Sequence, residues 1–123
     1  MEPGDLHQLV QEAFNSKDVD ALVALYEPKA WLFGPDGPVQ GHDAIRDTWA
    51  GFVAMDAQLE MVTQYIVLQD EIALLSNRWT ARIGDDEMSA VTAEVARRQP
   101  DGTWRYLIDN PCLLYTSPSP RDS

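Results

Sequence analysis

Residues 58–110 read QLEMVTQYIVLQDEIALLSNRWTARIGDDEMSAVTAEVARRQPDGTWRYLIDN, and this stretch decides the fold. Apolar and polar residues alternate along most of it, and a two-residue period is typical of β-strands. Turn-forming residues interrupt the alternation three times, at 70–71, 84–86 and 100–102. We therefore predict an antiparallel meander of four long strands, the first beginning at Gln58 and the others covering 72–83, 87–98 and 104–110.

Three helical patterns precede the meander. Asp5 and Gln8 have the spacing of a capping box, and the apolar residues that follow at helical spacing are Leu6, Leu9, Val10, Ala13 and Phe14. Asp18 is expected to cap a second, short helix that ends at Pro28 and turns inward Val19, Leu22, Val23 and Tyr26. A third helix follows Gly41, with an apolar stripe of Ile45, Trp49, Phe52 and Val53.

The order of the elements indicates the fold class. A short aromatic run at 30–33 predicts a strand, and the turn-forming residues at 34–38 end it. Helices come first and the long strands afterwards, which is typical of an α+β domain. A chain of 123 residues has room for one core. We expect one domain, in which three helices pack on a curved antiparallel sheet around an apolar pocket.

Composition excludes several classes of partner. The net charge is −11, with lysine only at Lys17 and Lys29, so the surface repels phosphate backbones and anionic lipids. We expect no nucleic-acid partner and no membrane partner. The first residues lack the features of a secretion signal, which predicts a cytoplasmic protein. With one cysteine and two histidines, we expect no disulfide framework and no metal site.

The end of the sequence differs in character from the rest. Residues 112–122 read CLLYTSPSPRD and resemble the translation of a sequencing-library transposase adapter, codon by codon. This resemblance implies a domain over residues 1–111 and a non-native tail over 112–123 that packs against nothing. The alternative is a natural polar tail, because Ser-Pro repeats are also typical of disordered ends.

Several motifs resemble one superfamily, named after nuclear transport factor two. The run at 15–22, NSKDVDAL, is similar to the helix pair of ketosteroid isomerases and SnoaL-like polyketide cyclases, and GHDAIR at 41–46 looks like the start of their third helix. Three later runs resemble a largely uncharacterised, ketosteroid-isomerase-like bacterial branch: TAEV at 92–95, RRQPDGTW at 97–104 and IDNP at 108–111. The resemblance covers nearly all of residues 5–111. It implies a cone-shaped, cystatin-like roll that holds a small, largely apolar molecule.

The resemblance also bears on chemistry. Some members are isomerases, dehydratases or cyclases that need no cofactor, so none is expected here. Carried over by position, the catalytic aspartate base of the steroid isomerases falls on Gly34 and their tyrosine on Val10. Their late-strand acid corresponds to Glu94. We therefore predict that this chain does not isomerise steroids by that mechanism.

Glu94 is the first candidate catalytic residue. Alternation places it on one face of its strand with Thr92, where a lone buried carboxylate would cost several kcal/mol. Burial would raise its pKa and suit an acid or hydrogen-bond donor. The alternative is a structural ion pair with an arginine such as Arg98 or Arg78.

Asp109 is the second candidate, and its position depends on the last hairpin. A four-residue loop would pair Arg98 with Thr103 and place Asp109 on the same face as Glu94. A three-residue loop would pair Gln99 with Thr103 and place Asp109 on the opposite face. The resemblance favours the first register, in which two close carboxylates would share a proton at neutral pH. Alternatively, Asp109 caps backbone amides near the chain end.

Five residues are candidates for ligand binding. Asn77 and Trp79 share a face, which the resemblance places inside the cone, and Thr92 lies on the face of the predicted acid. Trp31 and Tyr65 are predicted to complete an aromatic wall. For the aromatic residues, simple core packing is the alternative.

Three functions remain open from the sequence. The first is an isomerase- or lyase-like enzyme with Glu94 and Asp109 as acid and base, which a perturbed carboxylate inside the cone would favour. The second is a non-catalytic small-molecule binder, which pairing of Glu94 with an arginine would favour. The third is a dimeric interaction domain whose cone is filled by its own side chains. We also expect a homodimer.

Overall fold

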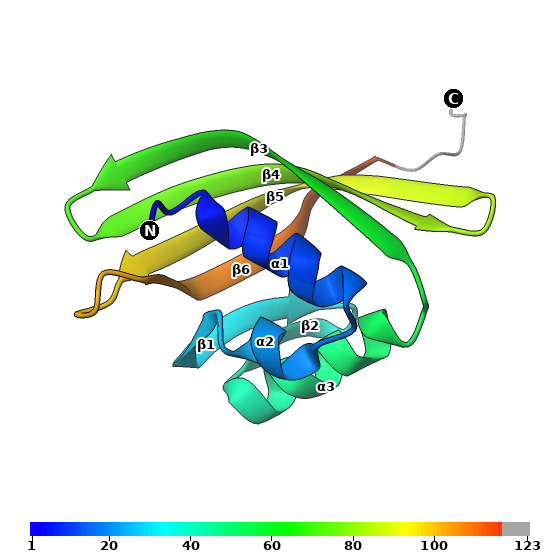
Figure 1. Cartoon of the computed structure of the whole chain (residues 1–123), viewed down its shortest axis with the longest axis horizontal. Helices are drawn as coiled ribbons and strands as arrows, with labels where there is room; N and C mark the ends of the chain where they lie inside the picture. The colour runs from blue at the N-terminus through cyan, green and yellow to red at the C-terminus, as the bar shows by residue number, and fades with distance from the viewer. Residues whose placement is uncertain (117–123) are drawn as a thin grey trace.

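The computed structural model describes the backbone of residues 1–116 and the side chains of residues 1–111. Within them the chain forms helices first and then a curved sheet (Figure 1), which confirms the predicted α+β class. The elements in chain order are α1 (Asp5–Asn15), α2 (Val19–Val23), β1 (Tyr26–Gly34), β2 (Gly37–Gln40), α3 (His42–Val53), β3 (Gln58–Gln69), β4 (Ile72–Ile83), β5 (Asp86–Arg98) and β6 (Trp104–Thr116).

The sheet has the strand order β2-β1-β6-β5-β4-β3. β1 runs parallel to β6, and the other neighbouring strands are antiparallel, so the predicted meander of β3 to β6 is confirmed. Figure 1 shows α1 lying along the long strands, while α3 lies beside β1 and β2. We call the side of the sheet covered by these helices the inner face, and the opposite side the outer face.

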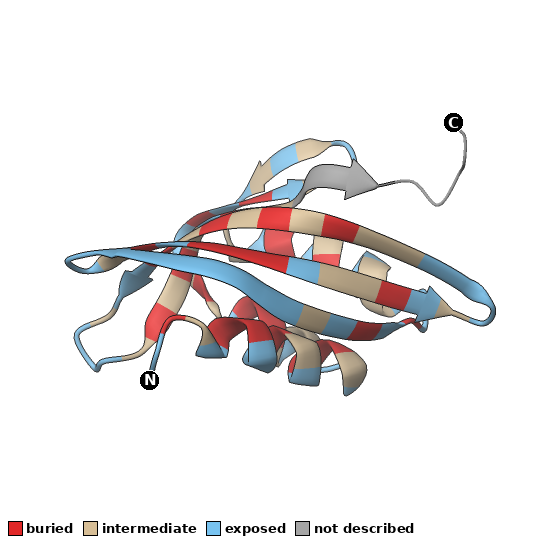
Figure 2. Cartoon of the chain, turned by 90° about the horizontal axis from the view of Figure 1, so that it is seen from above, coloured by how far each residue is buried: buried red, intermediate tan, exposed pale blue. Residues whose placement is uncertain are grey.

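Helix α1 is buried along one stripe, which is red in Figure 2, and its buried apolar residues are Leu6, Val10, Ala13 and Phe14. The predicted capping box is wrong. The Asp5 carboxylate accepts a hydrogen bond from the backbone N–H of Glu2, and the residue at the N-cap is Gly4. In the described part of the chain, no helix is both long and apolar enough to span a membrane.

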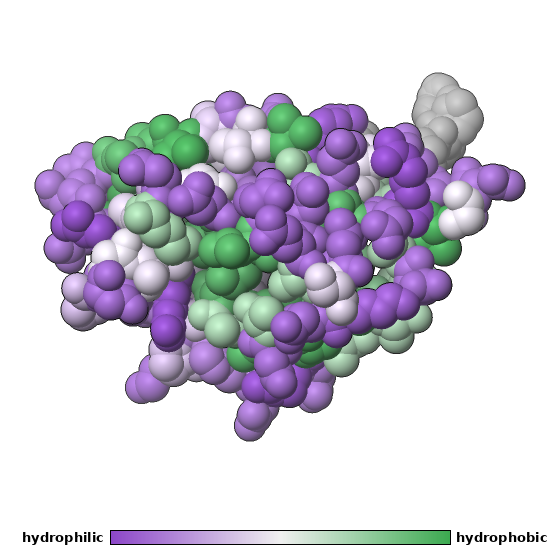
Figure 3. Space-filling view, viewed as in Figure 1, coloured by the Kyte–Doolittle hydropathy of each residue, from purple (hydrophilic) through white to green (hydrophobic). Residues whose placement is uncertain are grey.

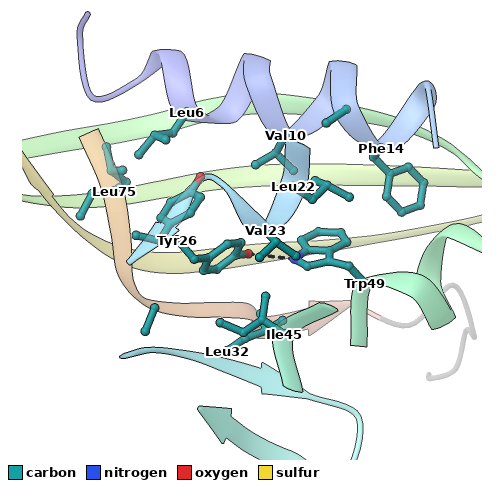
Figure 4. Close-up of a cluster of buried hydrophobic side chains, with 14 of the residues drawn as sticks. Leu6, Val10, Phe14, Leu22, Val23, Tyr26, Leu32, Ile45, Trp49 and Leu75 are labelled. Atoms are coloured by element: carbon teal, nitrogen blue, oxygen red, sulfur yellow. Dashed lines mark hydrogen bonds between the residues drawn. The ribbon is translucent and has the colours of Figure 1, made fainter. Parts of the chain in front are cut away.

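The core fills the space between the helices and the inner face. Figure 4 shows side chains from α1, α2, α3, β1 and β4 converging there, with Tyr26 and Trp49 joined by a hydrogen bond. Leu6, Leu22 and Leu32 have no exposed surface, and burying a side chain of this size contributes about 1.5–3 kcal/mol. This packing fixes α1 and α3 against the strands that carry the site.

Tyr26 begins β1 and does not belong to the second helix, which corrects the sequence prediction. Asp18 caps α2 as expected, but the helix ends at Val23. The backbone N–H of Tyr106 on β6 donates to the carbonyl of Leu25, at 2.8 Å, and this bond draws the chain into the sheet. Pro28, which has no N–H to donate, lies where the β1–β6 register shifts, so the strand tolerates it.

The hairpin between β5 and β6 begins in the three-residue register and then shifts by one residue. Gln99 and Thr103 are hydrogen-bonded through their backbones, and Gly102 has the left-handed φ of 86°, so the three-residue loop forms. A register shift then places Leu107 as an extra residue in β6. This bulge restores Asp109 to the face of Glu94. The favoured four-residue loop is therefore wrong and its three-residue alternative is right, whereas the face predicted for Asp109 is the one that the favoured register gave.

Strand β6 continues past the expected domain boundary at residue 111. Its backbone pairs with β5 as far as Thr116, which lies opposite Ser89. Residues 117–123 lie outside the described residues, and so does the prediction made for them. The adapter-like origin of residues 112–122 stays a prediction, because backbone pairing does not depend on where a sequence comes from.

Candidate functional site

Two carboxylates lie side by side on the inner face. Glu94 on β5 pairs directly with Asp109 on β6, because the bulge at Leu107 sets that register. On the same row of the sheet, Leu32 lies beside Asp109 and Leu75 beside Glu94. The side chains of Leu32 and Leu75 are fully buried, and the two acids are 2% and 6% exposed. The pair is therefore enclosed by apolar neighbours.

The two carboxylates border a cavity of about 290 Å³. Most of its lining is apolar and comes from α1, α3 and the inner face of the sheet, including Phe14, Trp49, Phe52, Met61 and Ala81. The polar side chains in the lining form one group, namely Asn77, Thr92, Glu94 and Asp109. A mostly apolar cavity with a few convergent polar groups is the usual form of a small-molecule site.

Glu94 is held by a histidine and an amide. The His7 Nε2 atom lies 2.6 Å from Glu94 Oε1, and the Asn77 amide donates to Glu94 Oε2 at 3.2 Å. The same amide donates to the Thr92 hydroxyl at 3.0 Å. The arginine pairing that the sequence left open is not found for this carboxylate among the described residues. Glu94 thus combines an ionisable partner with a neutral one.

Asp109 is held by a tyrosine. The Tyr26 hydroxyl donates to Asp109 Oδ2 at 2.5 Å and accepts a hydrogen bond from the Trp49 indole at 3.1 Å. Burial raises the pKa of Tyr26 well above its usual value, so this hydroxyl remains a donor. The partner of Asp109 is therefore a side chain, and not the backbone amides of the capping alternative.

The surroundings of Asp109 favour its protonated form. Burial, together with the nearby charge of Glu94, raises the pKa of Asp109 to about 8, although the hydrogen bond from Tyr26 acts in the opposite direction. Two carboxyl groups this close, shielded from water, do not both ionise readily. The site therefore pairs a neutral carboxylic acid with a second carboxyl group that a histidine supports.

The predicted aromatic wall of Trp31 and Tyr65 is not found. Trp31 lies on the outer face and is 40% exposed, because its neighbour Leu32 takes the inward position on β1. Tyr65 is 46% exposed, because a register shift makes Gln64 an extra residue in β3 and reverses the alternation beyond it. Neither residue is part of the cavity lining.

The remaining predicted ligand-binding residues do line the cavity. Asn77 and Thr92 are both 1% exposed and contact each other. Trp79 contributes part of the wall, and its indole N–H donates to the carbonyl of Pro111 at 2.6 Å. The structure thus brings together Glu94, Asp109, Asn77, Thr92 and Trp79.

Sequence reasoning missed His7 and Tyr26 as partners of the two acids, and Trp49 as the partner of Tyr26. His7 lies three residues before Val10, on the buried stripe of α1, and that spacing was the available signal. Tyr26 was assigned to a helix, so its contact with Asp109 across 83 residues was not foreseeable.

Gly34 and Val10, which the resemblance placed at the base and tyrosine positions of steroid isomerases, both line the cavity. Neither residue can transfer a proton. Among the described residues, moreover, no group of three or more His, Cys, Asp and Glu side chains could hold a metal ion. The acid–base groups of this site are therefore those on β5 and β6 and their partners.

Comparison with known proteins identifies the domain family and the fold. A model of the SnoaL-like domain matches residues 6–107. No curated protein matches the chain. Three solved structures illustrate the fold. An NTF-2-like protein of unknown function from Shewanella oneidensis MR-1 has a TM-score of 0.75 at 20% identity and covers 86% of this chain and 92% of its own.

A ketosteroid isomerase-like protein from Erwinia carotovora atroseptica SCRI1043 has a TM-score of 0.72 at 15% identity, covering 86% of this chain and 88% of its own. A protein of unknown function with a cystatin-like fold from Nostoc punctiforme PCC 73102 has a TM-score of 0.70 at 16% identity, covering 86% of this chain and 84% of its own. At these identities the likeness shows the fold alone. It confirms the predicted NTF2-like, cystatin-like architecture.

Proposed function

The chain belongs to the SnoaL-like domain family, and we propose that its cavity binds a small, largely apolar molecule and transfers a proton on it without a cofactor. The fold is one that supports small-molecule binding and isomerase or dehydratase chemistry. The proposal adds to this a set of roles: Asp109 is the acid, Glu94 is the base, and the apolar lining provides the binding surface.

One observation carries the proposal. Two buried carboxyl groups lie directly opposite each other at the edge of a cavity of about 290 Å³, and one of them has a pKa raised to about 8. A structural pair would be better served by an arginine partner, and a purely packed core would leave no such space. Pairs of titratable groups whose environments separate their pKa values are characteristic of acid–base sites.

The reaction class follows from these roles. A bound carbonyl compound would accept a hydrogen bond from the neutral Asp109 carboxyl group at its oxygen. The Glu94 carboxylate would then take a proton from the carbon next to the carbonyl, leaving an enolate stabilised by that hydrogen bond. Return of the proton to the same or another carbon gives exchange or isomerisation. Positioned acid–base groups contribute about 10²–10⁴-fold to such steps.

The test uses 2-tetralone, an apolar bicyclic ketone with acidic α-hydrogens. We expect the protein to accelerate incorporation of deuterium from D₂O at pD 7, as followed by proton NMR. Glu94→Gln and Asp109→Asn should each lower the acceleration by about 100-fold, whereas Glu87→Gln, an exposed change on the strand of Glu94, should keep it. No acceleration over buffer would refute catalysis.

A non-catalytic binder is the second candidate, because the lining is largely apolar and ready to hold a ligand. The fluorescence of 2-acetylnaphthalene, measured in H₂O where exchange of its acetyl hydrogens leaves the molecule unchanged, reports binding alone and separates the two candidates. Saturable binding without exchange of 2-tetralone would favour a binder. Absence of both would contradict the proposed function altogether.

We also propose a homodimer that forms through the outer face. One row of residues crosses five strands there and is apolar throughout: Trp31, Ile108, Val95, Leu74 and Val67. Figure 3 shows hydrophobic surface at the upper left, over the end of β3. A continuous exposed apolar patch favours contact with another protein surface.

In sedimentation velocity, Leu74→Glu should give monomers, whereas Leu9→Glu, an exposed change on α1, should not. A monomeric unsubstituted protein would contradict this.

A further inference from the structure

His7 joins the site to the protein surface. It is 2% exposed, and both of its ring nitrogens are engaged. Nε2 lies 2.6 Å from Glu94 Oε1, and Nδ1 lies 2.7 Å from the hydroxyl oxygen of Thr63. Thr63 is an exposed residue on β3, the last strand of the sheet order. Atoms that can carry a proton therefore form a chain from Glu94 to the surface.

We propose that His7 and Thr63 form a proton relay between Glu94 and solvent. This inference deepens the proposed function, on which its role in turnover rests. His7 does not line the cavity, so its contact with Glu94 does not occupy the space of a bound molecule. The relay would let the carboxyl group exchange its proton with water while the cavity is occupied.

The surroundings of Glu94 explain why a relay is needed. Glu94 is 2% exposed, and a ligand in the apolar cavity would exclude water from its remaining surface. Its other polar partner is the Asn77 amide, which does not titrate. That branch continues to the Thr92 hydroxyl, which is itself buried and bonded back to the carbonyl of Asn77. Of the two branches, the one through His7 alone reaches an exposed residue.

The proton transfers balance along this path. Protonated Glu94 gives its proton to His7 Nε2, while the proton on His7 Nδ1 passes to the Thr63 oxygen and the Thr63 hydroxyl proton passes to water. Glu94 becomes a carboxylate, and His7 changes from one neutral tautomer to the other. A proton that moves inward by the same steps restores the first tautomer. A reaction that removes one proton and returns one therefore resets the relay.

The test follows the His7 ring protons in the ligand-free protein labelled with ¹⁵N-histidine. We expect Thr63→Val to slow their exchange with water by at least tenfold, because it removes the hydroxyl and keeps the side-chain shape. Thr63→Ser should restore the rate. The matched control is Thr80→Val, on the outer face of β4, which should leave the rate unchanged.

A His7 exchange rate in Thr63→Val equal to that of the unsubstituted protein would overturn the relay. An exchange rate in Thr63→Ser as slow as that in Thr63→Val would also overturn the relay. Serine keeps the hydroxyl group that the relay uses, so a slow rate in both variants would mean that the hydroxyl is not what sets the rate. The 2-tetralone assay adds a second readout: Thr63→Val should lower the maximal exchange rate and leave 2-acetylnaphthalene binding unchanged. If the unsubstituted protein shows no exchange of 2-tetralone, the proposed catalysis fails, whereas slowed ring-proton exchange in Thr63→Val still supports the relay.

Discussion

Two neighbouring rows of the same sheet have opposite environments. The inner row is Leu32, Asp109, Glu94, Leu75 and Ile66, and the outer row, one residue away along each strand, is Trp31, Ile108, Val95, Leu74 and Val67. The inner row holds the charged residues, yet it is the more buried one. Burial here follows the face of the sheet to which a side chain points and not its hydrophobicity, and this is why we propose a function for the inner acids.

The largest expected effect is a difference in stability between variants of Leu75 and Leu74, which are adjacent residues on opposite faces of the sheet. Leu75 is fully buried, so Leu75→Ala should lower the free energy of unfolding by about 2–5 kcal/mol. Leu74 is 39% exposed, and Leu74→Ala should cost less than about 1 kcal/mol in the monomer. Urea unfolding at low protein concentration measures both. Equal losses would mean that the two faces do not differ as described.

A second prediction concerns pH. Asp109 has a folded-state pKa of about 8, whereas an ordinary aspartate titrates near ~3.9. The stabilisation from its bound proton is thus complete below the lower value, declines as the pH rises, and is lost above the higher value. Between pH 5 and pH 8, stability should fall by up to about 1.4 kcal/mol per pH unit more in the unsubstituted protein than in Asp109→Asn. Identical slopes in urea unfolding would contradict this.

A third and smaller effect is expected at Glu94. His7 and Asn77 both approach its oxygens, so Glu94→Gln would set an amide N–H₂ group against one of them. The cost should be about 1–3 kcal/mol in the free energy of unfolding. The control is Glu87→Gln, where an exposed ion pair with Arg82 is lost, and it should change stability by less than about 0.5 kcal/mol. An unchanged free energy of unfolding in Glu94→Gln would indicate that the carboxyl group has no partners.

Much of this comparison could be predicted from sequence. Alternation along 58–110 and the spacing of turn residues specify the meander, since both express local backbone preferences. The same alternation correctly placed Glu94 and Thr92 on the same face of the sheet. The helical stripe of α1 was predictable for the same reason. Family resemblance supplied the cone and its general purpose.

The errors arose where local patterns do not determine register. One extra residue at Gln64 moves Tyr65 outward, and one at Leu107 moves Asp109 inward. A single-residue bulge reverses every later side chain on its strand, and neither bulge has a clear sequence signal. The contacts of His7 with Glu94 and of Tyr26 with Asp109 join residues more than 80 positions apart, so only the folded chain reveals them.

Asp109 should stay protonated beside Glu94 at neutral pH, and carbon-detected NMR of the side-chain carboxyl groups measures this protonation at the residue itself. We expect the Asp109 carboxyl carbon to titrate near pH 8, and we expect Glu94→Gln to lower this midpoint because it removes the neighbouring charge. A midpoint near the ordinary value of about 4 in the folded protein would contradict the account. The site would then hold two carboxylates and no acid.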